Sequence, residues 1–338
     1  GALRGDGKTP LLLGPLPEPR GGAAPQERQE GMNKTNIGWV DHSSNPIRAR
    51  NIETGAQGHY CEKVSKGCEN CYASLWNEKR YGTGLAFDVR NRDKVEPWLN
   101  EKELREWLKP KYRGKSVFVE DMSDLFGAWV PDEWLDRIFA TMALAPEVTF
   151  RLLTKRIERA REYLTAEGRQ QAVETAAAEF ADLLSPHGPE APALLYGLAH
   201  FKTWPLPNVQ LGVSAEDQEQ ADKRIPVLLE TPAAVRWVSY EPALGPVEFC
   251  HCGSGAVQGY EGPLRDCWLH GEPGLSWIVV GGESGRDRRP FEVAWARSVV
   301  AQCKAADVPC FVKQDSAFKS EQQGRIPDDL WAVKELPR

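Results

Sequence analysis

The chain has 338 residues, of which 41% are hydrophobic and 12 are Trp, so it can bury a core the size of a large α/β barrel. This composition excludes an intrinsically disordered protein. The formal net charge of −6 argues against sequence-independent wrapping of DNA, which needs a broad basic surface, although local basic patches can still bind phosphate. No apolar run approaches the roughly 18 residues of a membrane span, so we expect a cytoplasmic protein without a membrane partner.

In chain order, residues 1–31 are rich in Gly, Pro and Arg and show no hydrophobic periodicity. This pattern predicts a disordered tail. Residues 32–338 alternate instead between short apolar runs and amphipathic segments, which predicts one α/β domain. Two longer stretches interrupt the alternation, and they predict a helical insertion at about 157–207 and a Cys/His-rich insertion at about 249–275.

Six short apolar runs fit strands that are buried on both faces of a parallel sheet. They lie at 116–119, 149–153, 209–213, 235–239, 277–280 and 310–312. Helical patterns occur between most of them, at 97–108, 131–144, 158–184, 216–229 and 291–306. This β/α alternation predicts a parallel α/β fold. A seventh strand before residue 61 is not clear from the sequence.

Polar or charged residues follow every apolar run directly. Because the carboxyl ends of parallel strands share one edge, where barrel enzymes build their active sites, these residues would gather at one mouth. The candidates for catalysis, which are poor helix caps, are Glu120, Lys155, Glu241, Glu283 and Lys313. The candidates for cofactor binding are Asp121, Ser214, Gly281 and Gly282. The Gly pair suits backbone that approaches a ligand closely or takes a positive φ. The alternative interpretation is that these residues only end strands and cap helices.

The strongest motif is Cys61-x6-Cys68-x2-Cys71, followed by a helical pattern over 73–80. Thiolates bind iron and zinc strongly, and a C-x2-C pair directs two sulfurs to one site. Three cysteines leave one coordination position open, as on a [4Fe–4S] cluster with one free iron, whereas structural zinc is closed by four ligands. Structural zinc completed by His59 or by a distant cysteine stays open as an alternative, and so do ordinary reduced cysteines.

Five motifs together resemble the three-cysteine phage protein family named for mycobacteriophage gene products 37 and 68, over about residues 34–316. They are VSKGCENCYA at 64–73, LLTKR at 152–156, LGVS at 211–214, YEP at 240–242 and VVGGESG at 279–285. The cysteine loop of that family is similar to the loop of radical S-adenosylmethionine (SAM) enzymes. The resemblance therefore implies a partial (β/α)6-type barrel, a [4Fe–4S] cluster, and SAM bound at the unique iron and cleaved to a 5′-deoxyadenosyl radical. A phage-encoded protein would act in the host cytoplasm.

Two features depart from the radical SAM pattern. The first gap between cysteines is six residues rather than three. The Gly-Gly-Glu at 281–283 follows a late strand, whereas the corresponding motif of those enzymes follows an early one. Glu120 or Asp121 stands nearer to that early position.

A second group, Cys250, Cys252, Cys267 and His270, lies inside the insertion at 249–275. Four ligands of this C-x-C…C-x2-H kind can close a structural zinc site. The C-x-C spacing is tighter than the common C-x2-C. A loop of unliganded thiols, or a ligand for a second cluster, therefore remain as alternatives.

The favoured function is a radical SAM-like iron–sulfur enzyme whose small-molecule cosubstrate binds at the mouth. Its substrate is predicted to be a nucleotide or nucleic acid, with phosphate contacts from Lys155, Arg156, Arg286, Arg288 and Arg289. The alternative is a non-catalytic, zinc-stabilised phage protein that binds a host partner. A metal-dependent or redox hydrolase is the weakest option, because the six His are dispersed. The oligomeric state is not predicted.

Overall fold

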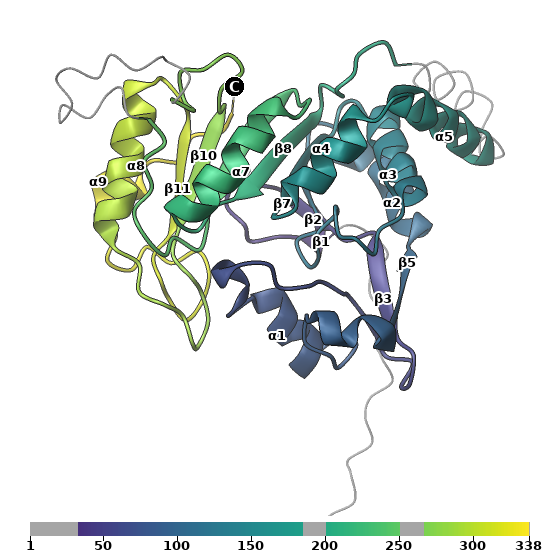
Figure 1. Ribbon diagram of the computed structural model, residues 1–338, viewed down its shortest axis with the longest axis horizontal. Coiled ribbons are helices and arrows are strands. Elements are labelled where there is room, and N and C mark those ends of the chain that lie inside the picture. Colours follow the sequence, from purple (N-terminus) through teal and green to yellow (C-terminus); the bar gives the residue numbers. More distant parts are fainter. Residues whose placement is uncertain (1–32, 185–200, 251–266, 338) are drawn as a thin grey trace, which may run out of the picture. The chain divides into compact units, whose positions relative to one another are not determined.

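The computed structural model describes residues 33–184, 201–250 and 267–337 (Figure 1). The chain divides into two units, Gly1–Gly31 and Met32–Arg338. The predicted tail at 1–31 and the predicted ligand Cys252 lie outside the described residues.

The centre of the second unit is an eight-stranded sheet (Figure 1). Its strands, in spatial order, are β1 (Asn33–Lys34), β2 (His42–Ser44), β6 (Ser116–Val119), β7 (Thr149–Thr154), β8 (Val209–Ser214), β9 (Val235–Tyr240), β10 (Trp277–Gly281) and β11 (Cys310–Gln314). Only β1 is antiparallel to its neighbour; the other seven strands are parallel. The seven parallel strands stand in the sheet in the same order as in the chain, as in a β/α barrel. Together they form a parallel half-barrel.

All six predicted runs are strands of this sheet, so the predicted α/β fold is confirmed and a partial barrel is consistent with the topology. The seventh parallel strand is β2, which the sequence did not reveal. Its three residues, His-Ser-Ser, carry no apolar run, although Ser43 and Ser44 are buried. It is held by parallel pairing with β6 from His42 to Ser44.

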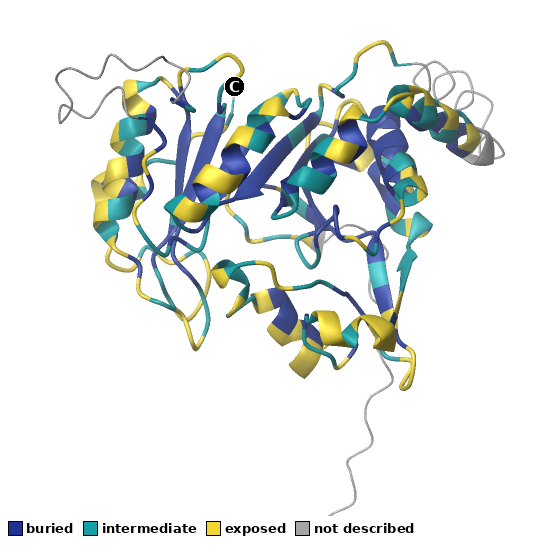
Figure 2. Cartoon of the chain, viewed as in Figure 1, coloured by how far each residue is buried: buried dark blue, intermediate teal, exposed yellow. Residues whose placement is uncertain are grey.

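Helices pack against the convex face of the half-barrel. They include α3 (Asp132–Leu144), α4 (Ile157–Thr165), α7 (Gln218–Glu230) and α8 (Val293–Ala305), with the four-residue α9 (Asp328–Trp331) beside α8. Helix α5 (Arg169–Leu184) packs on α3. Two of these helices begin at clear signals: α3 starts directly after Pro131, and the carboxylate of Asp217 caps α7 by accepting a hydrogen bond from Gln220 N at 3.0 Å. Figure 2 shows the strands buried and the outer helix faces exposed.

A second, three-stranded antiparallel sheet corrects one prediction. It consists of β4 (Gln57–Gly58), β3 (Ile47–Asn51) and β5 (Val95–Leu99), with β3 in the middle. The helix predicted over 97–108 therefore begins only at Glu101, as α2 (Glu101–Trp107). Residues Val95–Leu99 pair with β3 instead, as an edge strand in which Pro97 is tolerated. Short 3-10 turns at Lys66–Cys68, Val89–Lys94 and Pro110–Tyr112 complete the order, with α1 (Tyr72–Lys79).

Alternate residues of the strands enter two different cores. One set, including Val117, Leu152 and Val238, packs beneath the outer helices. The other set packs inside the half-barrel around Trp237 and Trp277, whose ring centroids lie 5.1 Å apart. The remaining inner members are Trp39, Val40, Phe118, Val279 and Phe311. The interior below the carboxyl edge is therefore filled by large side chains, so the half-barrel is not an open channel.

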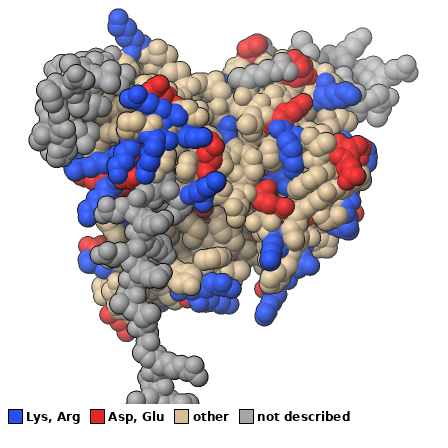
Figure 3. Space-filling model, turned by 180° about the vertical axis from the view of Figure 1, so that it is seen from behind, with Lys and Arg blue, Asp and Glu red and all other residues tan. Residues whose placement is uncertain are grey.

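Two surface properties bear on function. Within the ranges that the structure describes, no helix has the length and apolar character to cross a membrane. On the face seen in Figure 3, basic and acidic side chains lie interspersed around tan areas, and neither sign covers that face. This mixed surface agrees with the argument from net charge against a broad basic binding face.

Candidate metal centre

The three cysteines Cys61, Cys68 and Cys71 lie in one loop, residues 60–72, that crosses the carboxyl edge of the large sheet. We call this segment the cysteine loop. It is hydrogen-bonded to residues that follow four different strands. Those contacts are Ser123 Oγ to Tyr60 O at 2.6 Å, Arg156 Nη2 to Glu62 O at 2.8 Å, Gly67 N to Glu216 Oε1 at 3.1 Å, and Asn70 Nδ2 to Glu283 Oε2 at 3.0 Å. The loop is thus fixed over the mouth where the sequence predicted an active site.

Arg156, after β7, connects the loop to the sheet at Cys61. Its Nη1 lies 4.0 Å from Cys61 Sγ and donates to Asp124 Oδ2 at 2.9 Å. Asp124 also accepts hydrogen bonds from Thr154 Oγ1 at 2.7 Å and from Lys155 N at 3.1 Å. This network brings a guanidinium charge to a half-buried thiol.

Glu216, after β8, holds the middle of the loop from below. Its side chain is fully buried and forms an ion pair with Arg224 Nη1 at 2.9 Å. Burial would raise the pKa of Glu216, but the Arg224 guanidinium, Lys155 and the hydrogen bond from Gly67 outweigh it, so the pKa is lowered. Glu216 is therefore a buried carboxylate, and Gly67 N donates to its charge.

Glu283, after β10, holds the end of the loop together with Arg289. It forms an ion pair with Arg289 Nη2 at 2.6 Å, and Arg289 also donates to Lys66 O at 2.9 Å and pairs with Glu69 at 3.0 Å. Burial raises the pKa of Glu283, but the hydrogen bonds from Arg289 and Asn70 outweigh it and lower the pKa overall. The structure thus gives this predicted catalytic residue a role in positioning the cysteine loop.

The three thiols are half-buried and free. Burial is the main factor that raises the pKa of Cys61; Arg156 acts against it, while Cys71 and Cys68 add repulsion. Burial likewise raises the pKa of Cys71, with Lys155 acting against it and Cys68 adding to it. The thiols are therefore electrostatic neighbours in an enclosed site with two basic residues, Lys155 and Arg156.

The ligand atoms of the second cysteine group lie closer together than the three sulfurs of the cysteine loop. Among the residues that the structure describes, the only set of three ligand atoms all within 4.8 Å of one another is Cys250, Cys267 and His270. The three sulfurs of the cysteine loop are therefore spread more widely. Two sulfurs on one tetrahedral zinc would lie only about 3.8 Å apart, given Zn–S bonds of about 2.3 Å. His59, the alternative fourth ligand, is buried with Nδ1 3.3 Å from Ile47 O.

Glu120 and Asp121 lie where β6 meets the small sheet. Glu120 is 2% exposed, has φ of 63°, and accepts a hydrogen bond from Ile47 N at 2.7 Å. Burial raises its pKa well above the ordinary value, despite the hydrogen bond from Ile47. Asp121 accepts from Asn45 Nδ2 at 2.6 Å, and its backbone carbonyl accepts from Tyr72 OH at 2.6 Å. Asp121 is therefore next to the cysteine loop, whereas Glu120 faces the small sheet.

The remaining predicted residues lie at the same edge with different partners. Lys313 and Glu241 form a half-buried ion pair at 3.1 Å. Ser214 is buried, and its carbonyl accepts from Arg224 at 2.7 Å. At Gly281 an added Cβ would lie 2.6 Å from Glu241 Oε1, and at Gly282 it would lie 2.4 Å from Ser316 N. Both glycines thus allow close packing within the protein itself; neither has a positive φ.

The chain matches a family model described as "Protein of unknown function (DUF5131)" over residues 34–331. The chain belongs to the DUF5131 family. The match spans the cysteine loop and all the strand ends described above. No curated protein and no solved structure matches the chain.

Sequence reasoning missed several residues of the DUF5131 site. Asp124, Glu216 and Asn70 each join the cysteine loop or its anchors to the sheet. Asp124 and Glu216 follow β6 and β8, so the rule that selected Glu120 and Ser214 could have selected them. Asn70 gives no such signal, because its partner Glu283 lies 213 residues away in the chain.

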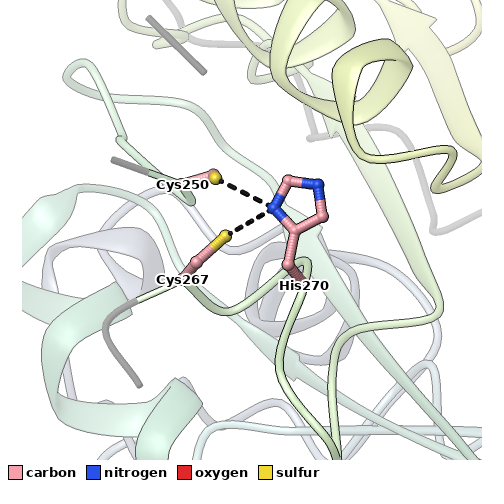
Figure 4. Close-up of side chains that lie close together, drawn as sticks. All are labelled: Cys250, Cys267 and His270. Carbon is pink, nitrogen blue, oxygen red and sulfur yellow. Dashed lines mark hydrogen bonds between the residues drawn. The ribbon is translucent and has the colours of Figure 1, made fainter. Parts of the chain in front are cut away.

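The second cysteine group lies at the opposite, amino-terminal edge of the sheet. Cys250 Sγ and Cys267 Sγ lie 3.4 Å and 3.1 Å from His270 Nδ1 (Figure 4). Ser276 N donates to Arg236 O, near the start of β9, at 2.8 Å. This group could hold a metal ion. Cys250 is also disulfide-bonded, so it could serve as a thiolate ligand only after reduction.

Proposed function

We propose that this chain is an iron–sulfur enzyme in which Cys61, Cys68 and Cys71 hold a [4Fe–4S] cluster. The observation that carries the proposal is the cysteine loop itself, which is tied across the carboxyl ends of four parallel strands and brings three free thiols to that edge. In parallel barrels this edge is the catalytic one. Lys155 and Arg156 next to the thiols suit a cluster with anionic thiolate ligands.

The chain's own residues would divide the work at this edge. Arg156, Glu216 and Glu283 position the loop through the contacts given above. Asp121 and the Glu241–Lys313 pair offer acidic and basic groups for a zwitterionic cosubstrate, and we propose SAM, as the resemblance to radical SAM enzymes implies. When bound, the cluster would supply one iron with an open coordination position and an electron.

Iron content and absorbance test the cluster directly. Protein purified or reconstituted without oxygen should contain about four irons per chain and absorb at about 400 nm. Cys68→Ala should lose both signals. Cys303→Ala is the matched control, because Cys303 is a buried thiol outside the cysteine loop and should keep them. Iron that is absent from the native protein, or unchanged in Cys68→Ala, would contradict the proposal.

Release of 5′-deoxyadenosine tests the SAM chemistry separately. Reduced, iron-loaded protein given SAM should form this product, and the Cys68→Ala variant should not. A protein that holds iron but leaves SAM intact would retain the cluster assignment and refute the radical SAM-like activity. Colourless protein that contains only zinc would favour instead a non-catalytic binding protein.

We further propose that Cys250, Cys267 and His270 hold a structural zinc ion, with Cys252 as the predicted fourth ligand. Sulfur and imidazole nitrogen are the usual ligands of structural zinc. The two sulfurs and the imidazole nitrogen here all lie within 4.8 Å of one another, close enough to bind one ion. At the amino-terminal edge of a barrel, such a site serves stability rather than catalysis. Reduced wild-type protein should contain one zinc that Cys267→Ala loses without loss of iron. Equal zinc in both proteins would refute this assignment.

A further inference from the structure

Helix α1, which follows the cysteine loop, turns its large apolar side chains outward. Of nine large hydrophobic residues that are exposed in the described part of the chain, five lie between residues 64 and 81. They are Val64, Tyr72, Leu75, Trp76 and Tyr81, with exposures of 47%, 45%, 39%, 46% and 67%. The inward face of α1 carries only the small or polar Ala73, Ser74 and Asn77. This arrangement reverses the usual amphipathic pattern, in which the apolar stripe faces the core.

Buried polar contacts fix the helix in this orientation. Asn77 is 2% exposed and accepts from His59 N at 2.9 Å, while its Nδ2 donates to Thr83 Oγ1 and Leu85 O, both at 2.8 Å. Ser74 Oγ accepts from Phe87 N at 2.9 Å. A rotation that buried the apolar stripe would break these bonds and bury unpaired polar groups. The exposed stripe is therefore built into the fold.

Basic side chains accompany the exposed rings. The Arg80 guanidinium lies 5.3 Å from the centroid of the Trp76 ring, and the Tyr81 ring lies 6.0 Å from it. Lys79 and Arg80 are both exposed. Along residues 63–81 there are four Lys or Arg residues and two Glu, which gives +2 in a chain whose net charge is −6. At the end of the cysteine loop that leads into α1, Asn70 Nδ2 donates to Asp287 O at 2.8 Å, and the exposed Arg286 and Arg288 flank Asp287.

We infer that the face formed by Tyr72, Trp76, Lys79, Arg80 and Tyr81 binds single-stranded nucleic acid beside the metal centre. Exposed aromatic rings stack on bases irrespective of sequence, and the adjacent cations bind the phosphates. Charge complementarity favours a polyanion with exposed bases, because Lys79 and Arg80 lie beside the exposed rings of Trp76 and Tyr81 at the end of α1. That nucleic acid is the substrate of the enzyme rests on the proposed function. That this face binds nucleic acid rests only on its exposed residues.

Fluorescence anisotropy with a labelled oligonucleotide of about 16 nucleotides, as DNA and as RNA, tests the inference. Wild-type protein should bind, and binding should weaken as salt rises from about 50 to 200 mM. Trp76→Ala should weaken binding about five- to hundredfold, the range found when a stacking side chain is truncated, and Trp76→Phe should restore most of it. Arg80→Glu should weaken binding and reduce its salt dependence.

Two control variants keep the result specific. Ile52→Ala removes an exposed apolar side chain from another part of the surface, and Lys223→Glu reverses an exposed charge on α7. Both should bind as the wild type does. No binding by the native protein, equal binding by Trp76→Ala, or preference for anionic vesicles over oligonucleotides would overturn the inference. The Cys68→Ala variant separates this inference from the proposed function. A variant that loses iron but still binds the oligonucleotide supports the binding surface independently of the cluster. Native protein that holds iron but does not bind the oligonucleotide refutes only the binding surface.

Discussion

The Glu216–Arg224 pair offers the sharpest test of how the cysteine loop is held. Both side chains are almost completely buried, at 0% and 3% exposure, and Glu216 accepts the hydrogen bond from Gly67 N in the middle of the loop. Glu216→Gln keeps the shape but removes the charge, which leaves the Arg224 guanidinium without its counter-ion. Breaking a buried pair of this kind costs about 3–5 kcal/mol. Because Arg224 keeps its bond to Ser214 O, we expect the lower end, about 3 kcal/mol.

The loss of stability expected for Glu216→Gln should also depend on pH. The folded-state pKa of Glu216 is lowered, so its contribution to stability is present above the unfolded pKa of about 4.3 and is lost as pH falls through the folded pKa. The glutamine variant cannot titrate. The difference in unfolding free energy between the two proteins should therefore be largest near neutral pH and shrink in acid.

Urea unfolding at several pH values measures this difference, and hydrogen exchange at the Gly67 amide reports the loop. Glu69→Gln is the matched control, because Glu69 pairs with Arg289 at the rim with 61% of its side chain exposed. An exposed pair of that kind contributes only about 0–1 kcal/mol. Equal, small losses in the two variants, with unchanged exchange at Gly67, would refute the role given to Glu216.

Three further predictions concern buried groups. Glu120→Gln should be at least as stable as the wild type at pH 8 and lose that advantage near pH 4 in urea unfolding, because the raised pKa of Glu120 makes ionisation above the unfolded pKa of about 4.3 unfavourable in the folded state. Gly212→Ala should cost about 1–3 kcal/mol, since its Cβ would lie 2.3 Å from the Trp237 ring, and adding Trp237→Phe should recover part of the loss. Asn77→Ala should raise proteolysis within α1 before global unfolding, since it leaves buried partners of the side chain unpaired.

The strands that are buried on both faces were predictable, because each appears in the sequence as a continuous run of apolar residues. Residues 209–213 are an example, since β8 is buried along almost its whole length. Strand β2 (His-Ser-Ser) has no such apolar run. Its residue Ser44 is buried because its hydroxyl donates to Glu103 at 2.9 Å and accepts from Trp107 Nε1 at 2.8 Å, which are contacts made only in the folded chain. A buried strand stabilised by polar contacts cannot be recognised from hydrophobicity.

The site was predictable in its location and less so in its roles. The rule that parallel strands end at one edge is enough to place Glu241, Glu283 and Lys313 together from the sequence alone. It could not distinguish a residue that faces a ligand from one that holds a loop. That distinction depends on the partner, and for Glu283 the partners are Arg289 and Asn70, the latter on a segment far away in sequence.

The two cysteine groups differ in what they are attached to, and this difference argues for two different roles. The cysteine loop is bound to residues after β6, β7, β8 and β10, so any group that orders it also orders the mouth of the half-barrel. The second group is attached to one connection, between β9 and β10, and to α8 through the bond from Cys250 N to Gln302 at 3.1 Å. A metal there can stabilise only that corner. Chemistry that needs groups from several strands to converge is therefore possible at the first group and not at the second.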